Sequence, residues 1–437
     1  MEEISPLVRK AGRAHPRVVL ACEHASAQFG GEAAIPLHYF RTLRNKGVDV
    51  WLVTHARTRD ELMRLFPGES RIIFIVDSRL HRALWQVTRR LPAGFAYFTS
   101  GYVSRLSVQW RQRRIIRQLV RDQDIDIVHQ PIPVSPREPS MLFDLGAPVI
   151  IGPMNGGMDY PPAFRRHRPI LGRALLALGR MSAGTLNRLI PGKRRAALLL
   201  VANHRTRLAL PSLDRVPVRE LVENGVDMTI WHGDPKRSDS PPPAVTTFTF
   251  IGRLVAWKAV DLLLHAFGAA SVKAPMRLLI IGDGPEAKPL RALAVNLGIL
   301  AADLPHTGRV SFAGWLSQRE CAERLDQADV LVLPSLLECG GAVVLEAMSL
   351  AKPVIATAWG GPVDYIDESC GILVEARGRD EVIRGFADAM HRLSLSPELR
   401  VRLGNSGRQK ILDQYDWDKK ADQMLAFYKL AIAAADV

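Results

Sequence analysis

Cysteine is scarce in this sequence, with four residues in a chain of 437. Cys22, Cys321, Cys339 and Cys370 have neither the spacing of a metal site nor that of a disulfide framework, which excludes a disulfide-stabilised secreted domain and predicts a reducing compartment. No uncharged apolar run reaches the roughly 18 residues that a membrane-spanning helix needs. The acidic start Met1-Glu2-Glu3 shows no signal-peptide pattern. We therefore expect a cytoplasmic protein, at most peripheral on the inner face of the cytoplasmic membrane.

Aromatic residues are also few, at 7% of the chain, and no recognised nucleic-acid-binding motif is present. Nucleic acid is therefore not an expected partner, although the net charge is +14. The positive charge is unevenly distributed. Residues 1–240 hold 37 Lys and Arg against 21 Asp and Glu, whereas the remaining 197 residues hold 21 and 23. The first half of the chain thus carries the whole excess.

The excess is densest in residues 151–200, where nine basic residues accompany a single acid, Asp159. Apolar residues are interspersed with the arginines, which is typical of a basic amphipathic segment, and residues 110–121 have the same character. Such a segment can rest on anionic lipid, form a solvated helix face or bind nucleic acid, and we favour an anionic membrane surface. The arginines concerned are Arg165, Arg166, Arg168, Arg173, Arg180 and Arg188.

Short apolar runs alternate with helical patterns along the whole chain, and its length and 47% hydrophobic content allow two buried cores. In the second half each run ends in a glycine turn. This rhythm predicts doubly wound parallel sheets with a ligand at the carboxyl ends of the strands. The expected strands are residues 17–22, 48–53, 71–76, 126–129 and 148–151 in the first half, and 248–251, 277–281, 310–315, 328–334 and 352–356 in the second.

Two glutamates, Glu338 and Glu346, lie eight positions apart just after the expected strand 328–334. Between them, Gly340 and Gly341 allow a sharp turn with converging N–H groups, and a helix is expected from Ala342. The N-terminus of a helix attracts anions, while carboxylates can accept hydrogen bonds from hydroxyls. The pattern therefore suits a ligand that carries both phosphate and hydroxyl groups, as a sugar nucleotide does.

Two cations follow the expected strand 248–251. Arg253 comes directly after Gly252, and Lys258 lies five residues later, which suits a diphosphate. The next strand ends in Gly282-Asp283-Gly284, but Ala287 stands where the third glycine of a dinucleotide-binding fingerprint would be. A Rossmann dehydrogenase is therefore only a partial match.

Together these motifs, over residues 245–375, resemble the nucleotide-sugar domain of the family-4 retaining glycosyltransferases. The resemblance implies a GT-B fold, with two Rossmann-like α/β domains facing across a cleft. It also implies that Arg253 and Lys258 neutralise the donor diphosphate, that Glu338 contacts the transferred sugar, and that Glu346 holds the ribose hydroxyls. The family usually has an aromatic residue where Gly340 stands. The residues implied at the donor are Gly30, Gly31, Gly252, Arg253, Lys258, Gly282, Trp315, Glu338, Gly340, Gly341, Ala342 and Glu346.

The same resemblance extends loosely over the first half. Gly30 and Gly31 are similar to the family's amino-terminal glycine loop, although a plain turn explains them equally well. We predict an acceptor-binding domain over residues 1–235, a proline-rich linker at 236–244, a nucleotide-sugar domain at 245–415, and a C-terminal helix, 416–437, that crosses back onto the first domain.

Charge placement suggests the mechanism. Negative charge develops on the departing nucleoside diphosphate, where fixed cations and amides have the largest effect. No Asp-x-Asp motif follows a strand, so we expect no catalytic metal and no cofactor. The expected reaction is the retaining transfer of a hexose from a UDP- or GDP-sugar, with the leaving phosphate taking the acceptor proton. The catalytic candidates are Glu338, Arg253, Lys258 and His129.

The acceptor side is less defined. His129 ends an expected strand and is the first candidate there, with Asn155 as a possible orienting residue. The basic first half suggests a lipid-linked or anionic glycan acceptor, as in cell-envelope or exopolysaccharide synthesis. A GT-B epimerase, a phosphorylase and a non-enzymatic binder of carbohydrate or membrane surfaces remain as alternatives.

Overall fold

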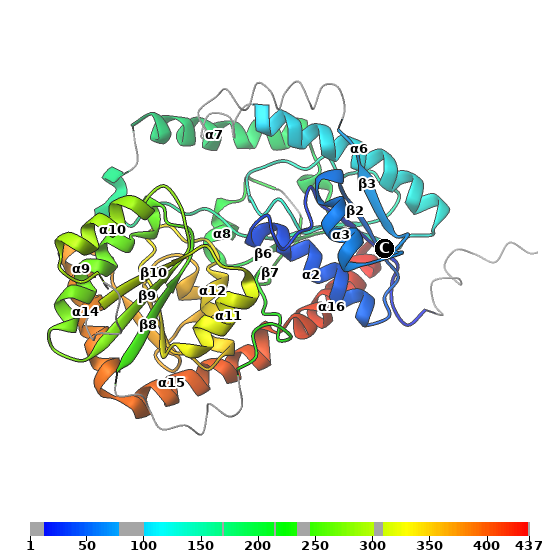
Figure 1. Cartoon of the computed structure of the whole chain (residues 1–437). Helices are drawn as coiled ribbons and strands as arrows, with labels where there is room; N and C mark the ends of the chain where they lie inside the picture. The colour runs from blue at the N-terminus through cyan, green and yellow to red at the C-terminus, as the bar shows by residue number, and fades with distance from the viewer. Residues whose placement is uncertain are drawn as a thin grey trace, which may run out of the picture. The chain divides into compact units, whose positions relative to one another are not determined.

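The computed structural model describes residues 13–77, 100–167, 170–213, 216–233, 245–300 and 309–435 (Figure 1). The chain divides into two compact units. The first unit comprises Met1–Gly157, Arg168–Glu223 and Lys420–Val437, and the second comprises Met158–His167 and Asn224–Lys419. The predicted linker 236–244 lies outside the described residues, as do Arg168 and the side chains of Arg173 and Arg180.

The first unit is built on a sheet of seven parallel strands in the order β3-β2-β1-β4-β5-β6-β7. Its inner strands are buried along their whole length, as expected for a parallel sheet covered on both faces. The order reverses between β1 and β4, which makes their carboxyl ends the expected place for a ligand. The strands are β1 (Val18–Ala21), β2 (Val50–His55), β3 (Ile72–Ile75), β4 (Ile127–Gln130), β5 (Val149–Met154), β6 (Leu198–Val201) and β7 (Val218–Glu220).

Helices connect these strands. α2 begins after Gly30, whose φ of 99° is a conformation that glycine adopts without steric cost. Asn203 caps α8 by accepting a hydrogen bond from the backbone N–H of Thr206. The helical segments are α2 (Gly31–Asn45), η1 (Ala56–Thr58), α3 (Arg59–Leu65), α6 (Ser100–Asp122), α7 (Ile170–Leu189), η3 (Lys193–Arg195), α8 (His204–Ala209) and α16 (Trp417–Ala435).

Most of the last helix, α16, belongs to the first unit. Lys46, the C-cap of α2, pairs with Asp422 at 2.8 Å, and the Lys420 ammonium donates to the carbonyl oxygen of Val222. Tyr428 lies fully buried in the same unit. These contacts hold α16 in the first unit, although the helix lies far from the strands of that unit in the sequence.

The second unit contains six parallel strands in the order β10-β9-β8-β11-β12-β13. Figure 1 shows α9, α10 and α14 on one side of this sheet and α11 and α12 on the other. The predicted fold class, two doubly wound α/β sheets, is therefore confirmed. The strands are β8 (Thr246–Ile251), β9 (Met276–Ile281), β10 (Arg309–Gly314), β11 (Val330–Leu333), β12 (Val354–Thr357) and β13 (Gly371–Val374).

The helical segments of the second unit follow the strands closely. Ser317 and Glu320 form a capping box at the start of α11, which fixes where that helix begins. The segments are η2 (Pro162–His167), η5 (Ala256–Lys258), α9 (Val260–Ser271), α10 (Ala287–Asn296), α11 (Gln318–Gln327), α12 (Ala342–Ser349), α13 (Pro362–Tyr365), α14 (Arg379–Leu395), α15 (Pro397–Lys410) and η6 (Ile411–Tyr415).

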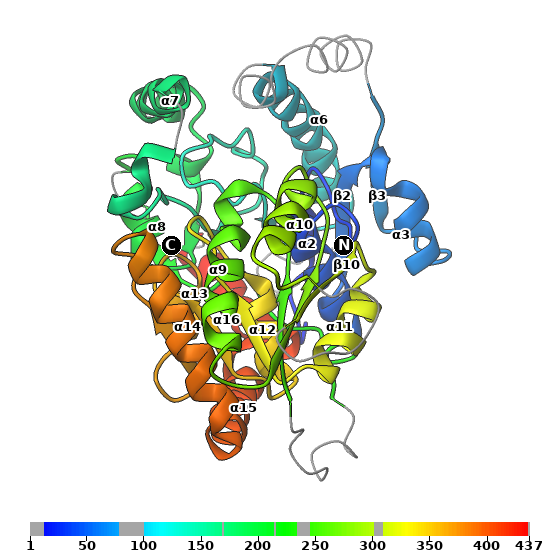
Figure 2. The ribbon, with the colours of Figure 1, turned by 60° about the vertical axis from the view of Figure 1, so that its left-hand side comes forward.

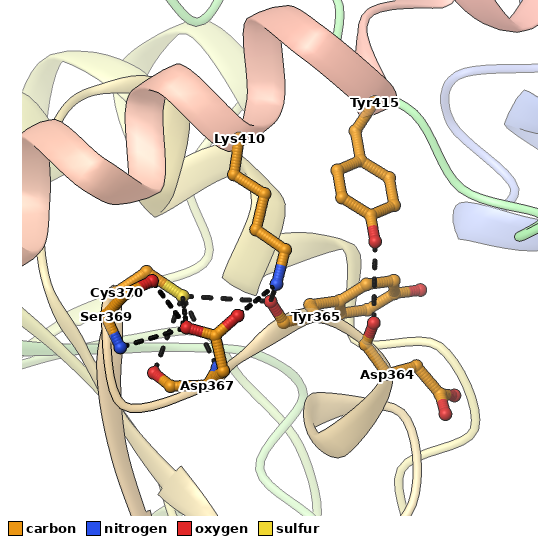
Figure 3. A network of polar contacts seen from close by, with 7 residues as sticks. All are labelled: Asp364, Tyr365, Asp367, Ser369, Cys370, Lys410 and Tyr415. Carbon is orange, nitrogen blue, oxygen red and sulfur yellow. Dashed lines mark hydrogen bonds and ion pairs between the residues drawn. The ribbon is translucent and has the colours of Figure 1, made fainter.

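A polar network holds the loop between α13 and β13 (Figure 3). The Lys410 ammonium on α15 donates to the Asp367 carboxylate and to the carbonyl oxygen of Tyr365, both at 2.7 Å. Asp367 also accepts from the backbone N–H of Ser369 at 2.9 Å. The hydrogen bond from Lys410 is the main reason that the pKa of Asp367 lies well below its ordinary value. The network ties α15 to the segment that follows α13. That segment comes shortly after the glycine pair Gly360-Gly361.

Candidate functional site

Glycine loops end the three strands β8, β9 and β10 at the carboxyl edge of the second sheet. The backbone N–H of Gly252 donates to Ile281 at 3.0 Å, and that of Gly282 donates to Gly314 at 2.7 Å. Gly282 has a φ of 137°, and a Cβ there would collide with the carbonyl oxygen of Gly252. Only glycine fits this position. Its lack of a side chain lets the backbones of the loops after β8 and β9 lie close together.

The loop after β11 leads into α12. Gly341 is the N-cap of α12 with a φ of 75°, and no side chain caps this end of the helix. The first N–H groups of α12 are therefore free of side-chain acceptors and suited to an anion. Gly340, Gly341 and Ala342 all lie in this segment, as the sequence predicts.

A second glycine loop supports the first, and the sequence analysis did not assign it to the site. The N–H of Gly361 donates to the carbonyl oxygen of Glu338 at 2.7 Å. A Cβ at Gly361 would collide with the carbonyl oxygen of Gly340, and one at Gly360 would collide with that of Glu338. The sequence marks this second loop by the Gly360-Gly361-Pro362 run after β12. It does not show which other loop the run contacts.

Lys258 and Glu338 form an ion pair between their side chains, whose exposed fractions are 15% and 14%. The backbone supports this pairing, because the N–H of Leu336 donates to the carbonyl oxygen of Trp257 at 2.9 Å. The structure thus brings together the two residues that sequence reasoning placed at the diphosphate and at the sugar. Arg253, in contrast, is exposed and forms no ion pair within the described part of the chain.

Glu346 lies one helical turn after Ala342 on α12. Burial raises the pKa of its carboxyl group to about 8. The pKa of the Cys321 thiol is raised to about 11, mainly by burial and to a smaller extent by the nearby Glu346 carboxyl group. Across the residues that the structure describes, the Glu346 carboxyl group has no hydrogen-bond or ion-pair partner. The side chain is half-buried, so a ligand that supplies hydrogen-bond donors can still reach it.

Trp315 follows β10 and is 75% exposed. In the first unit, Gly30 and Gly31 are exposed at the start of α2. The loop before them is held by Glu61, which accepts from the Ser26 hydroxyl and from the backbone N–H of Ala27. The role implied for this loop at the donor phosphates stays a prediction.

The structure does not support the acceptor-side role predicted for His129. Its side chain is fully buried, and its two ring nitrogens contact the Tyr428 hydroxyl at 2.7 Å and the Gly152 carbonyl oxygen at 2.6 Å. A carbonyl oxygen only accepts, so Nε2 carries the proton and Nδ1 accepts from Tyr428. Burial lowers the pKa of His129 to about 4. No ring nitrogen is left for a substrate, and His129 instead anchors α16.

Asn155 is also buried, with 4% exposure. Its amide donates to the Glu223 carboxylate at 2.6 Å, and its carbonyl oxygen accepts from the Thr206 hydroxyl at 3.4 Å. These contacts tie the end of β5 to α8 and to the segment after β7. The orienting role predicted for Asn155 is therefore replaced by a structural one.

Two general properties bear on the site. Within the described ranges no helix is both long and apolar enough to cross a membrane. In the same ranges, no group of three or more His, Cys, Asp or Glu side chains is placed to hold a metal ion.

The chain is similar in sequence to several bacterial enzymes. It is 32% identical over 206 residues to a D-inositol 3-phosphate glycosyltransferase of Saccharomonospora viridis, covering 44% of each chain. It is 29% identical over 229 residues to an alpha-maltose-1-phosphate synthase of Mycolicibacterium smegmatis, covering 50% of this chain and 58% of the relative. The match thus spans about half the length of these curated relatives.

Solved structures show the same fold over nearly the whole chain. The Anabaena protein HepE, solved in complex with UDP, has a TM-score of 0.62 at 14% identity, covering 94% of this chain and 99% of that one. WaaG, a glycosyltransferase involved in lipopolysaccharide biosynthesis, has a TM-score of 0.56 at 15% identity, covering 93% and 99%. Residues 236–410 match the family model described as glycosyl transferases group 1. Over this segment the chain is similar to the group 1 glycosyl transferases, and its two sheets have the GT-B architecture of the solved structures.

Proposed function

We propose that this protein transfers a hexose from a UDP- or GDP-linked donor to a glycan or lipid-linked acceptor, with retention of configuration and without a catalytic metal. The observation that carries the proposal is Glu346, a half-buried carboxyl group with a raised pKa and no partner among the described residues, on a helix whose N-terminus no side chain caps. A nucleoside diphosphate offers partners both to Glu346, in the middle of α12, and to the N-terminus of that helix. Its ribose hydroxyls can donate to Glu346, and its phosphates can accept from the first amides of α12.

The diphosphate would meet two cations in the second unit. Arg253 is exposed and unpaired among the described residues, so its guanidinium can reach a ligand without breaking an existing ion pair. Lys258 already faces Glu338 and would share its charge with a phosphate oxygen. Both cations would stabilise the negative charge that develops as the donor bond breaks.

In the proposed reaction, the bond between the anomeric carbon and the phosphate oxygen breaks while the acceptor oxygen bonds to the same face of the sugar. The departing phosphate oxygen takes the acceptor proton, so no protein base is needed. Glu338, held by Lys258 and by the backbone of Gly361, would contact the sugar hydroxyls. These interactions raise the rate of the chemical step if they are stronger in the transition state than in the ground state.

The relatives support this choice of chemistry. The sequence relatives are a D-inositol 3-phosphate glycosyltransferase and an alpha-maltose-1-phosphate synthase by name, and the HepE structure contains UDP. WaaG acts in lipopolysaccharide biosynthesis, which is in keeping with a role of this chain in cell-envelope or exopolysaccharide assembly.

We include an anionic membrane surface among the proposed partners. Arg188 is exposed on α7, which Figure 2 shows nearly end-on, and the same helix exposes Met181 by 79% and Leu189 by 74%. Basic and apolar side chains together suit an anionic lipid interface. Replacing Arg188 by glutamate should reduce sedimentation with phosphatidylglycerol vesicles, and unchanged sedimentation would show that this arginine is merely solvated.

Thermal melting with nucleotides tests the donor assignment. UDP or GDP should raise the melting temperature, NAD should not, and Glu346→Ala should abolish the shift. Asp388→Ala is the matched control, because Asp388 is an exposed acid on α14 of the same unit. If neither nucleoside diphosphate protects the wild-type protein, the proposed function is wrong. If a nucleoside diphosphate does protect the protein, a second assay distinguishes transfer from epimerisation. In it, a radiolabelled hexose should pass from the donor to an acceptor in membrane extracts.

A further inference from the structure

The segment Met158–His167, which we call the strap, lies in the chain between β5 and α7 of the first unit, yet it belongs to the second unit. Tyr160 and Phe164 anchor it there, with exposed fractions of 9% and 3%. The backbone N–H of Phe164 donates to the carbonyl oxygen of Pro161 at 2.8 Å, which closes the first turn of η2. A short piece of the first half of the chain is thus built into the unit that carries the donor loops.

Trp359 joins the strap to the segment after β12. Its indole Nε1–H donates to the carbonyl oxygen of Asp159 at 2.8 Å, although the two residues lie 200 positions apart in the sequence. The Trp359 side chain is partly buried. Because an indole has a single proton to donate, this hydrogen bond holds the backbone of the strap at one defined place.

Gly360 is the point at which the strap meets the loop of Glu338. Its φ is 77°, and a Cβ there would collide both with the thioether end of Met158 and with the carbonyl oxygen of Glu338. Both groups therefore pack closely on Gly360. The next residue, Gly361, donates its N–H to the same carbonyl oxygen of Glu338 at 2.7 Å. Two adjacent glycines thus connect the strap to the backbone of Glu338.

The position of Glu338 depends on this connection because its loop is irregular. Residues 334–341 form neither helix nor strand, so no ladder of regular hydrogen bonds fixes Glu338. Its side chain is held by Lys258 and its carbonyl oxygen by Gly361. Without the backbone hydrogen bond, the carboxylate would be held through the long side chain of a lysine. A displacement of about 1 Å in a group that positions a substrate can lower the rate by about 10²-fold.

We propose that the strap is a positioning element of the donor site, in which Met158 and Trp359 set the place of Glu338 through the two glycines. This inference rests on the proposed function, because it takes Glu338 to face the transferred sugar. It goes further in assigning part of the donor site to a segment from the first half of the chain. The nucleotide, in contrast, would be held by α12 and Glu346. The strap should therefore act on sugar turnover and spare the affinity for the nucleoside diphosphate.

Three variants of the full chain test the proposal. Met158→Ala removes the contact with Gly360, and Trp359→Phe removes the indole N–H while an aromatic ring stays. Met158→Leu is the conservative variant, since it keeps an apolar side chain of similar volume. Hydrogen–deuterium exchange measured by mass spectrometry should be faster in peptides that contain Gly361 in the first two variants. It should stay close to wild type in Met158→Leu.

Kinetics and calorimetry separate a positioning role from a purely structural one. The probes are UDP, GDP, UDP-glucose, UDP-galactose, UDP-N-acetylglucosamine and GDP-mannose. For the nucleotide sugar that the wild-type protein hydrolyses fastest, kcat should fall about 10- to 100-fold in Met158→Ala and Trp359→Phe. The dissociation constant of the matching nucleoside diphosphate should change by less than about twofold. Met63→Ala, at a 41% exposed methionine of α3 in the first unit, is the matched control and should leave every value unchanged.

Unchanged exchange of the Gly361 peptides in both Met158→Ala and Trp359→Phe would overturn the inference. So would a nucleoside diphosphate affinity that falls as far as kcat, since the strap would then only support the fold of the unit. If UDP or GDP binds but the wild-type protein turns over none of the four nucleotide sugars, the inference also fails, while the nucleotide site of the proposed function stands. If neither UDP nor GDP binds, both fail.

Discussion

Lys258 and Glu338, which lie 80 positions apart in the sequence, form an ion pair at the carboxyl edge of the second sheet. Both side chains are largely buried, so neither charge can lose its partner cheaply. In the proposed reaction the same lysine faces a diphosphate and the same glutamate faces the sugar. The pair would therefore couple donor binding to the position of Glu338.

Lys258→Met should remove a cation from the diphosphate and leave Glu338 unpaired. We expect kcat/KM for sugar transfer to fall by about 10²–10³-fold, the usual cost of losing a group that stabilises developing negative charge. Steady-state kinetics and UDP calorimetry measure the effect. Lys273→Met, at an exposed lysine of the same unit, is the control. Wild-type kinetics in Lys258→Met would contradict the assigned role.

Glu346 should make nucleotide binding dependent on pH. Its pKa of about 8 means that the free protein holds a proton there at pH 7. Ribose hydroxyls favour the carboxylate, so binding should release this proton, and affinity should rise up to about tenfold per pH unit until pH 8. UDP calorimetry from pH 6 to pH 9 tests this. Since the UDP phosphate also titrates, Glu346→Gln is the reference, and identical profiles for both proteins would refute the prediction.

The same carboxyl group should affect stability in the absence of ligand. Its folded pKa is raised above the ordinary 4.5, so the unfolded chain loses this proton first as the pH rises. The contribution of Glu346 to stability should therefore fall between pH 4.5 and about 8. Urea melts should show a decline over this window that is smaller in Glu346→Gln.

Gly361→Ala should disturb the site without touching a charged residue. The new Cβ would collide with the carbonyl oxygen of Gly340 and displace the loop that carries Glu338. We expect a loss of about 1–3 kcal/mol in stability, typical of overpacking, together with reduced sugar transfer. Gly184→Ala is the contrast, because nothing lies within 4 Å of a Cβ at this helical glycine. That change should be neutral or stabilising, and equal melting temperatures for the two variants would contradict the packing argument.

His129 should affect stability rather than chemistry. Its folded pKa of about 4 lies below the ordinary 6.5, so the stability from the neutral ring is complete above pH 6.5 and is lost as the pH falls toward 4. We expect a loss of about 2 kcal/mol between pH 6.5 and pH 4.5. Tyr428→Phe should remove the hydrogen bond to Nδ1 and lower the melting temperature while kcat stays unchanged. A large fall in kcat in the folded variant would restore a catalytic role for His129.

Five of the six strands of the second unit and their glycine turns were predictable, because alternating apolar runs and glycines report local backbone preferences, whereas β13 was not predicted. Glu338, Gly340, Gly341 and Glu346 were found for the same reason, since one strand, one turn and one helix hold them all. His129 shows where such reasoning ends. A histidine at a strand end looks available, but Tyr428 packs against it from 299 positions away in the sequence.

The sequence by itself determined the two α/β units and the glycine loops of the second unit, because helical and strand periodicity and turn chemistry act over a few neighbouring residues. Only the tertiary structure decided that Lys258 pairs with Glu338, that Gly361 supports that loop, and that Met158 of the strap packs on Gly360. Each of these relationships joins distant segments. Their geometry follows from the packing of whole helices against a sheet, the sum of many weak contacts that no local pattern records.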